Sequence, residues 1–291
     1  MRTTTMFVTR HPVTAFYALV FAISWGGILL VIGGPGAIPG SGEQIERLTL
    51  PVLLALFAGP SIGGIVMTGI ASGRAGFREL LSRLLLWRLS LRWYAAAILF
   101  APFLVTTVLV ALALLSPAFI PAVVTADNKV TLVLFGMGWG LFGGGLLEEL
   151  GWTGFAAPNL RRRHAALTTA LIVGFLWGTW HILIALWMGG GLAEGQWTPY
   201  LLGILVFYLT ALPAFRVLLV WIYDRTESLL LVMLMHASFS ASMLILQPPL
   251  AGALFLRWNL AIAAALCVVI VAIAAANGWR VSRRPLHEGV A

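Results

Sequence analysis

Residues 143–154 read GGGLLEELGWTG, and this stretch sets two adjacent acidic side chains, Glu148 and Glu149, inside an otherwise apolar segment. A charged side chain at the centre of a bilayer costs roughly 2.5–3.5 kcal/mol even on insertion scales. The pair is therefore expected to face a polar cavity among helices rather than lipid. Consecutive glycines let neighbouring backbones approach closely. We therefore expect this segment to be a central helix of a membrane bundle.

The composition of the whole chain supports a membrane protein. Hydrophobic residues make up 60 % of the 291 residues, charged residues only 10 %, and the mean hydropathy is +0.98. Soluble domains have about 45–50 % apolar and about 25 % charged residues. A membrane span needs about 20 apolar residues. The sequence predicts an all-α, single-domain chain (residues 1–291) with eight spans, at residues 13–32, 50–71, 93–115, 130–150, 165–187, 200–223, 229–246 and 258–279.

The distribution of basic residues predicts the orientation. If loops alternate sides, 15 of the 18 Lys and Arg residues lie on the side that holds both termini, with two of them at Arg216 and Arg225. Cytoplasmic loops carry the excess of basic residues, so we expect a plasma-membrane protein with both termini in the cytoplasm and an uncleaved first span. Orientation also explains the net charge of +8 better than nucleic-acid binding. The single cysteine, Cys267, rules out a disulfide within the chain.

Two basic segments each have two interpretations. Residues 77–91 mix leucines with arginines, which is typical of an amphipathic helix on an anionic leaflet and equally of a plain topology signal. The run Arg161-Arg162-Arg163-His164 is interpreted as the end of the fourth span in preference to a lipid-headgroup site.

Two histidines join the glutamates as ionisable residues inside predicted spans. His181 lies in the fifth span and His236 in the seventh, with Ser240 one helical turn after His236. Adjacent residues on a helix point about 100° apart, so Glu148 and Glu149 are expected to have different roles. Alternatively, the glutamates cap the span at the water interface and each histidine is a core residue bonded to a carbonyl. The four residues together favour a convergent site.

Glutamate and histidine in a dry site are suited to activating water. A positioned carboxylate acts as general base, and a histidine holds the water or stabilises developing charge. The same residue types also bind Zn²⁺ in two-His-one-Glu catalytic sites, although no His-Glu-x-x-His helix is present. Residue identity leaves both mechanisms open.

The expected depths of these residues in the membrane do not match. At about 1.5 Å per residue, His181 lies about 24 Å from Ala165, whereas His236 lies about 12 Å from Ser228. The side chains meet only if a helix is tilted, if the fourth span breaks at residues 151–154, or if the cytoplasmic edge dips inward.

The chain resembles the CPBP family, which comprises CAAX prenyl endopeptidases of the Ras-converting-enzyme type and bacteriocin-processing proteins. The family looks like eight-helix intramembrane proteases with three motifs: Glu-Glu-x-x-x-Arg, an aromatic residue four before a histidine, and His-x-x-x-Asn/Asp. Here the matches are Glu148-Glu149 with Thr153, Trp177 with His181, and His236 with Ser240. Two positions depart from the motifs, because Thr153 replaces the arginine and Ser240 replaces the asparagine or aspartate.

The resemblance implies a role for each residue. Glu148 would be the base that activates water for peptide hydrolysis, His181 would position this water, and Glu149 would support the pair. His236 and Ser240 would stabilise the oxyanion. The substrate would be a membrane-associated peptide or protein in a bacterial membrane, with no metal in the favoured mechanism and Zn²⁺ in the alternative. The departures imply that Glu149 loses an ion-pair partner and that an oxyanion donor is weakened.

Three functions follow from the sequence. The first is an intramembrane endopeptidase that cuts near the cytoplasmic leaflet. The second is a proton-coupled transporter that uses the buried carboxylates and histidines as a relay. The third is a catalytically weakened family member that acts as an immunity or scaffold protein.

Overall fold

The computed structural model describes residues 10–190, 192–278 and 281–282, and over this part of the chain the regular elements are all helices. Most are α-helices, η1 and η2 are single 3₁₀ turns, and η3, η4 and η5 are π-helical. In chain order they are α2 (Pro12–Ile32), η1 (Pro35–Ala37), α3 (Gly42–Leu84), α4 (Leu91–Ala113), η2 (Pro117–Phe119), α5 (Ala122–Thr125), α6 (Lys129–Trp139), η3 (Gly140–Glu148), α7 (Glu149–Gly151), η4 (Trp152–Ala156), α8 (Ala157–Arg161), α9 (Ala166–Met188), α10 (Trp197–Val206), η5 (Phe207–Ala211), α11 (Leu212–Thr226), α12 (Leu229–Leu246) and α13 (Gly252–Ala276).

Eight helices in the described residues are long and apolar enough to cross a membrane, which confirms the predicted all-α membrane bundle. Two of these are composite: the Lys129–Arg161 helix joins α6, η3, α7, η4 and α8, and the Trp197–Thr226 helix joins α10, η5 and α11. The predicted end of the last span, residue 279, lies outside the described residues, as do the basic residues that were counted in the two terminal segments, apart from Arg10.

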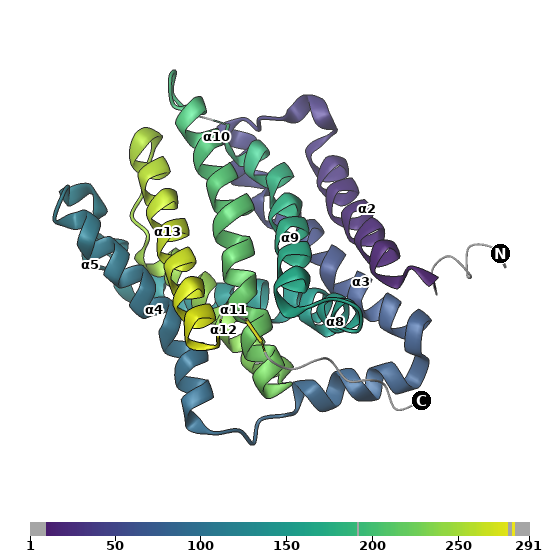
Figure 1. Cartoon of the computed structure of the whole chain (residues 1–291). Helices are drawn as coiled ribbons and strands as arrows, with labels where there is room; N and C mark the ends of the chain where they lie inside the picture. The colour runs from purple at the N-terminus through teal and green to yellow at the C-terminus, as the bar shows by residue number, and fades with distance from the viewer. Residues whose placement is uncertain (1–9, 191, 279–280, 283–291) are drawn as a thin grey trace.

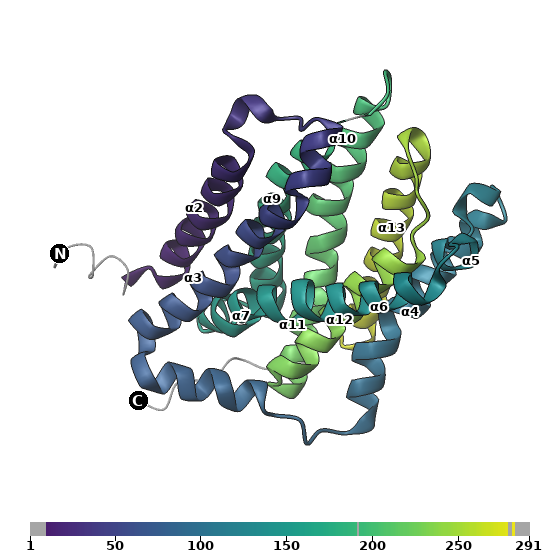
Figure 2. The ribbon, with the colours of Figure 1, turned by 180° about the vertical axis from the view of Figure 1, so that it is seen from behind.

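The helices do not all run in the same direction. Helices α2, α9, α13 and the Trp197–Thr226 helix extend along the bundle, whereas the Lys129–Arg161 helix crosses behind them (Figures 1 and 2). We call the end where α2 begins and the α8–α9 turn lies the proximal end. The other end, where α9 finishes, is the distal end. The oblique course of the Lys129–Arg161 helix brings its middle, with the two glutamates, into the centre of the bundle.

Glycines in η3 allow this central helix to approach α12. A Cβ atom added to Gly144 would collide with the side chains of Ser240 and His236, and one added to Gly140 would collide with the carbonyl oxygen of Ala237. Both positions therefore need glycine for the two backbones to lie this close. The close approach that was expected from the glycine run is confirmed.

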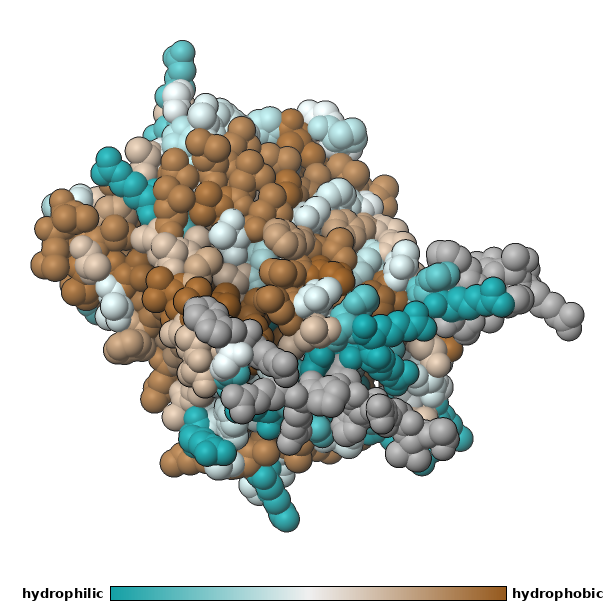
Figure 3. Space-filling view, in the orientation of Figure 1, coloured by the Kyte–Doolittle hydropathy of each residue, from teal (hydrophilic) through white to brown (hydrophobic). Residues whose placement is uncertain are grey.

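The outer surface is suited to lipid. Many large apolar side chains are exposed, among them Leu30, Phe103 and Val268, at 85 %, 75 % and 68 % exposure. Apolar residues cover the middle of the face in Figure 3, and hydrophilic residues gather toward its upper and lower edges. Such extensive exposed apolar area is typical of a surface that contacts membrane or partner proteins.

Helix α3 changes direction at Gly73, which has φ 54° and ψ −141°. This conformation is accessible almost only to glycine. The segment after it, residues 74–84, lies across the proximal end (Figure 1). Of residues 77–91, for which a helix was one of two interpretations, those as far as Leu84 are helical, and those between there and the start of α4 at Leu91 are not.

Candidate functional site

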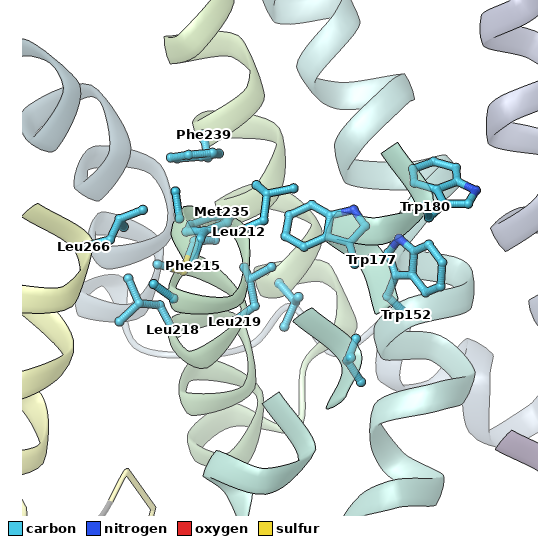
Figure 4. Close-up of a cluster of buried hydrophobic side chains, with 14 of the residues drawn as sticks. Trp152, Trp177, Trp180, Leu212, Phe215, Leu218, Leu219, Met235, Phe239 and Leu266 are labelled. Atoms are coloured by element: carbon cyan, nitrogen blue, oxygen red, sulfur yellow. The ribbon is translucent and has the colours of Figure 1, made fainter. Parts of the chain in front are cut away.

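Glu148 lies at the end of π-helical η3, and its carboxylate is held by two tryptophans. Its Oε2 accepts hydrogen bonds from Nε1 of Trp152 at 3.1 Å and from Nε1 of Trp177 at 2.5 Å. The two indole nitrogens are turned toward each other (Figure 4). Trp152 follows Glu148 by four residues on the same composite helix, whereas Trp177 comes from α9. Because both of these hydrogen bonds end on Oε2, Oε1 is the oxygen available to a water or substrate.

Glu149, the next residue, has entirely different surroundings. Its side chain is fully buried, and Arg216 of α11 binds both of its oxygens, at 2.8 and 2.9 Å. Oε2 also accepts a hydrogen bond from the Thr153 hydroxyl at 2.5 Å, and Oε1 lies 2.7 Å from Nδ1 of His236. A carboxylate with this set of donors is ionised and has no lone pair left for catalysis, so its surroundings suit a positioning role.

Arg216 is a site residue that the sequence analysis missed. The arginine is fully buried, and its guanidinium lies 4.3 Å from the ring centre of Trp177. The expectation that Glu149 loses its ion-pair partner is therefore wrong, because Arg216 supplies from another helix what Thr153 does not supply from four residues away. Counting Arg216 with the proximal basic residues was also wrong, since it lies well inside the Trp197–Thr226 helix.

Glu149 fixes a proton on Nδ1 of His236, which belongs to α12. Since both carboxylate oxygens accept hydrogen bonds from Arg216, Nδ1 of His236 must be the donor in the 2.7 Å contact. The other ring nitrogen, Nε2, lies beside the Cα of Gly144, and so does the hydroxyl of Ser240. The small size of Gly144 thus leaves space next to two polar groups that come from successive turns of α12.

His181 of α9 lies among aromatic rings. Its Nδ1 is 3.0 Å from the carbonyl oxygen of Trp177, and because a carbonyl only accepts, this nitrogen carries a proton. The imidazole stacks on Tyr208, with 4.9 Å between ring centres and 7° between planes. Nε2 of the neutral ring is then an acceptor that is oriented by the other contacts.

These side chains line one cavity of about 770 Å³. Glu148, His181, His236 and Ser240 are at its wall, whereas Glu149 is not. The remaining lining is mainly apolar and aromatic, and it extends along α9 to Met188 and past the end of α12 to Pro248. The cavity therefore reaches toward the distal end of α9, away from the α8–α9 turn.

The comparison with known families identifies the part of the chain that carries this site. Residues 129–242 match the family described as type II CAAX prenyl endopeptidase, Rce1-like. The chain carries a domain of this family. The matched range contains all five predicted site residues and Arg216. No curated protein matches the chain. Membership of the CAAX endopeptidase family indicates an intramembrane protease that acts on a protein substrate.

The burial of Glu148 and Glu149 overturns the interpretation of these residues as interfacial caps. Glu148 is 4 % exposed and Glu149 is 0 % exposed, and the helix that holds them continues to Arg161. There is thus no break at residues 151–154, although η4 is π-helical there. Of the three explanations given for how these side chains could meet, the structure shows the first, a tilted helix.

The donor set of the candidate site does not fit the Zn²⁺ alternative. Within the described residues, no three His, Cys, Asp or Glu side chains lie close enough to hold a metal ion. Of the two glutamates, one is fully engaged by Arg216 and His236, and the other has one oxygen bound to two indoles. A catalytic zinc site requires three protein ligands around one ion. We therefore derive no step through a metal.

Proposed function

We propose that the chain is an intramembrane endopeptidase in which Glu148 activates a water molecule for hydrolysis of a peptide bond in a membrane-associated peptide or protein. We further propose that residues 1–291 act as one domain in a bacterial plasma membrane, with both termini in the cytoplasm. The observation that supports the catalytic proposal most strongly is the position of the Glu148 carboxylate. Its Oε2 accepts hydrogen bonds from two indole N–H groups, which leaves Oε1 available. The carboxylate lies at the wall of a cavity that His181, His236 and Ser240 also line.

In this mechanism Glu148 Oε1 takes a proton from water as the water oxygen attacks the carbonyl carbon of the peptide. The two indole donors keep the carboxylate in a fixed direction, so that no reorientation is needed during the reaction. When the tetrahedral intermediate collapses, the carbon–nitrogen bond breaks and the leaving amine receives the proton from Glu148.

His181 orients the attacking water in the proposed mechanism. Its Nδ1–H is committed to the Trp177 carbonyl, so Nε2 can accept a hydrogen bond from the water. The second hydrogen of the water then points to Glu148. Stacking on Tyr208 keeps the imidazole plane fixed.

His236 and Ser240 stabilise the oxyanion of the intermediate. Glu149 accepts a hydrogen bond from Nδ1 of His236 and fixes the ring, and Nε2 donates to the oxyanion when it carries a proton. The Ser240 hydroxyl is the second donor. Removal of one oxyanion donor costs about 10²–10³ in rate, so both groups are expected to contribute measurably even with serine at the family's Asn/Asp position.

The test is the cleavage of a membrane-peptide library by the purified full chain in lipid. Glu148→Gln keeps the shape of the side chain and removes the base, so cleavage should fall by at least about 10²-fold. Glu46→Gln, which neutralises an exposed glutamate, is the matched control and should cleave like wild type. A third arm adds a chelator, which should leave cleavage unchanged.

Other outcomes favour other functions. Loss of cleavage with chelator would support a metal mechanism. Absence of cleavage by folded wild-type protein would support the weakened family member that acts as an immunity or scaffold protein. Proton-coupled flux that depends on Glu148, without any cleavage, would support a transporter.

A further inference from the structure

A second groove, of about 690 Å³, lies at the proximal end, between the start of α2 and the α8–α9 turn. Its mouth is basic. It is lined by Arg10 and His11 on one side and by Arg162, Arg163 and His164 on the other, and none of the lining residues that the structure describes is acidic. These two groups are about 150 residues apart in the sequence, so their convergence on one opening could not be read from the run at residues 161–164 alone.

The turn that carries the second basic group is held rigidly. Arg161 is buried and forms a two-pronged ion pair with Asp224 of α11, at 2.6 and 3.0 Å. The same guanidinium donates a hydrogen bond to the carbonyl oxygen of His164 at 2.8 Å. The exposed side chains of Arg162 and Arg163 are therefore displayed from a fixed backbone, which lowers the entropy cost of binding an anion.

The interior of the groove is apolar. Phe21, Ile172 and Leu176 form part of its wall. Phe21 is nine residues after Pro12, the first residue of α2, which corresponds to about 14 Å along the helix. The headgroup region of one leaflet is only about 5–7 Å thick, so a groove of this length continues past the headgroups into the hydrocarbon layer.

Tyr17 lies between the basic mouth and these apolar residues. It lines the groove, its ring stacks on Trp152, and its buried hydroxyl has no hydrogen-bond partner among the described residues. Buried hydroxyl groups nearly always have a partner. In Figure 3, hydrophilic surface gathers where the start of α2 and the α8–α9 turn lie in Figure 1.

We propose that this groove binds one anionic glycerophospholipid, with its phosphate at Arg10, Arg162 and Arg163 and an acyl chain along Phe21 and Leu176. The basic mouth selects a negative headgroup, and the apolar walls distinguish a lipid from a water-soluble anion. The groove is separate from the proposed catalytic cavity. Both are lined in part by α9, but they have no lining residue in common.

Native mass spectrometry of the full chain in detergent tests this proposal, with dioleoyl phosphatidylglycerol and dioleoyl phosphatidylcholine as probes because they share acyl chains. Phosphatidylglycerol should bind at least about tenfold more tightly at the first site. Arg162→Gln/Arg163→Gln should lose this preference, since each arginine near an anionic headgroup contributes about fivefold. The matched control, Arg74→Gln/Arg78→Gln, removes two exposed proximal arginines outside the groove and should keep it.

Three results would overturn the proposal. One is an unchanged preference in the Arg162→Gln/Arg163→Gln variant. Another is an equal loss in the control variant, which would mean that diffuse surface charge attracts the lipid. The third is complete displacement of phosphatidylglycerol by millimolar inorganic phosphate, which would mean that the mouth binds free anions and that the apolar walls contribute nothing.

Discussion

At the scale of single residues, the ion pair of Glu149 and Arg216 decides how the site is held. The family motif places an arginine four residues after the second glutamate, and Thr153 occupies that position here. Arg216 reaches the same carboxylate from α11 and also lies 3.3 Å from the Thr153 hydroxyl. In this chain the positive charge that binds Glu149 therefore comes from α11 and not from the helix that carries Glu149. This arrangement adds a tertiary constraint, because the partner ties two helices together.

Loss of Arg216 should therefore destabilise the fold as well as the site. Arg216→Met leaves the fully buried Glu149 charge without its main partner, and breaking a buried pair in this way costs about 3–5 kcal/mol. The double variant Arg216→Met/Glu149→Gln also removes the unpaired Glu149 charge, so it should recover part of the lost stability. Thermal unfolding in detergent measures both effects.

The control for this comparison is Arg74→Met, at an exposed arginine of α3. Its effect should stay within about 0.5 kcal/mol, as is usual for surface substitutions. Equal destabilisation of the single and double Arg216 variants would contradict this explanation, since the unpaired Glu149 charge would then contribute nothing to the loss of stability.

At the scale of elements, the contact between η3 and α12 sets the width of the proposed catalytic cavity. Gly144→Ala places a methyl group against Ser240 and His236, and overpacking of this kind costs about 1–3 kcal/mol. Cleavage should fall along with stability, because the displaced groups are the proposed oxyanion donors. Gly138→Ala is the matched control on the same composite helix, since nothing lies within 4 Å of the added Cβ. Wild-type cleavage by Gly144→Ala would show that α12 can shift without affecting the reaction.

The sequence predicts the elements better than it predicts how they meet. Eight apolar segments are recognisable because each must satisfy its backbone hydrogen bonds within lipid, and an ionisable residue inside one is conspicuous because of its cost. The oblique course of the Lys129–Arg161 helix depends on packing between distant segments, so no local pattern predicts it. For the same reason Arg216 was assigned to a proximal loop. Arg216 lies seven residues inside the predicted span 200–223, and a charge at such a position was the signal that could have identified it as a site residue.

The hydrogen bonds to Glu148 illustrate the same limit within the site. The motif comparison identifies Trp177 as an aromatic residue, but it does not predict that the indole N–H would hold a carboxylate 29 positions earlier. The second donor, Trp152, is four residues after Glu148, a spacing at which helical neighbours meet. That contact could have been predicted from the spacing, whereas the one from α9 needed the fold.

At the scale of the whole molecule, the distribution of basic residues and the position of the proposed catalytic cavity together predict which side of the membrane each end of the bundle faces. The proximal end carries most of the arginines and is expected to be cytoplasmic, whereas the cavity extends to Met188 and Pro248 near the opposite end of α9. The proposed hydrolysis site would then be reached more directly from the non-cytoplasmic side, in contrast to the expectation of cleavage near the cytoplasmic leaflet.

Cysteine labelling in whole cells tests this sidedness. In a Cys267→Ala background, which removes the single native cysteine, a membrane-impermeant maleimide should label Glu194→Cys in intact cells. It should label Arg88→Cys only after permeabilisation. Both positions are exposed and lie in connections at opposite ends of the bundle, so the pair controls for reagent access. Labelling of Arg88→Cys in intact cells, with Glu194→Cys protected, would invert the topology and place the wide end of the cavity in the cytoplasm.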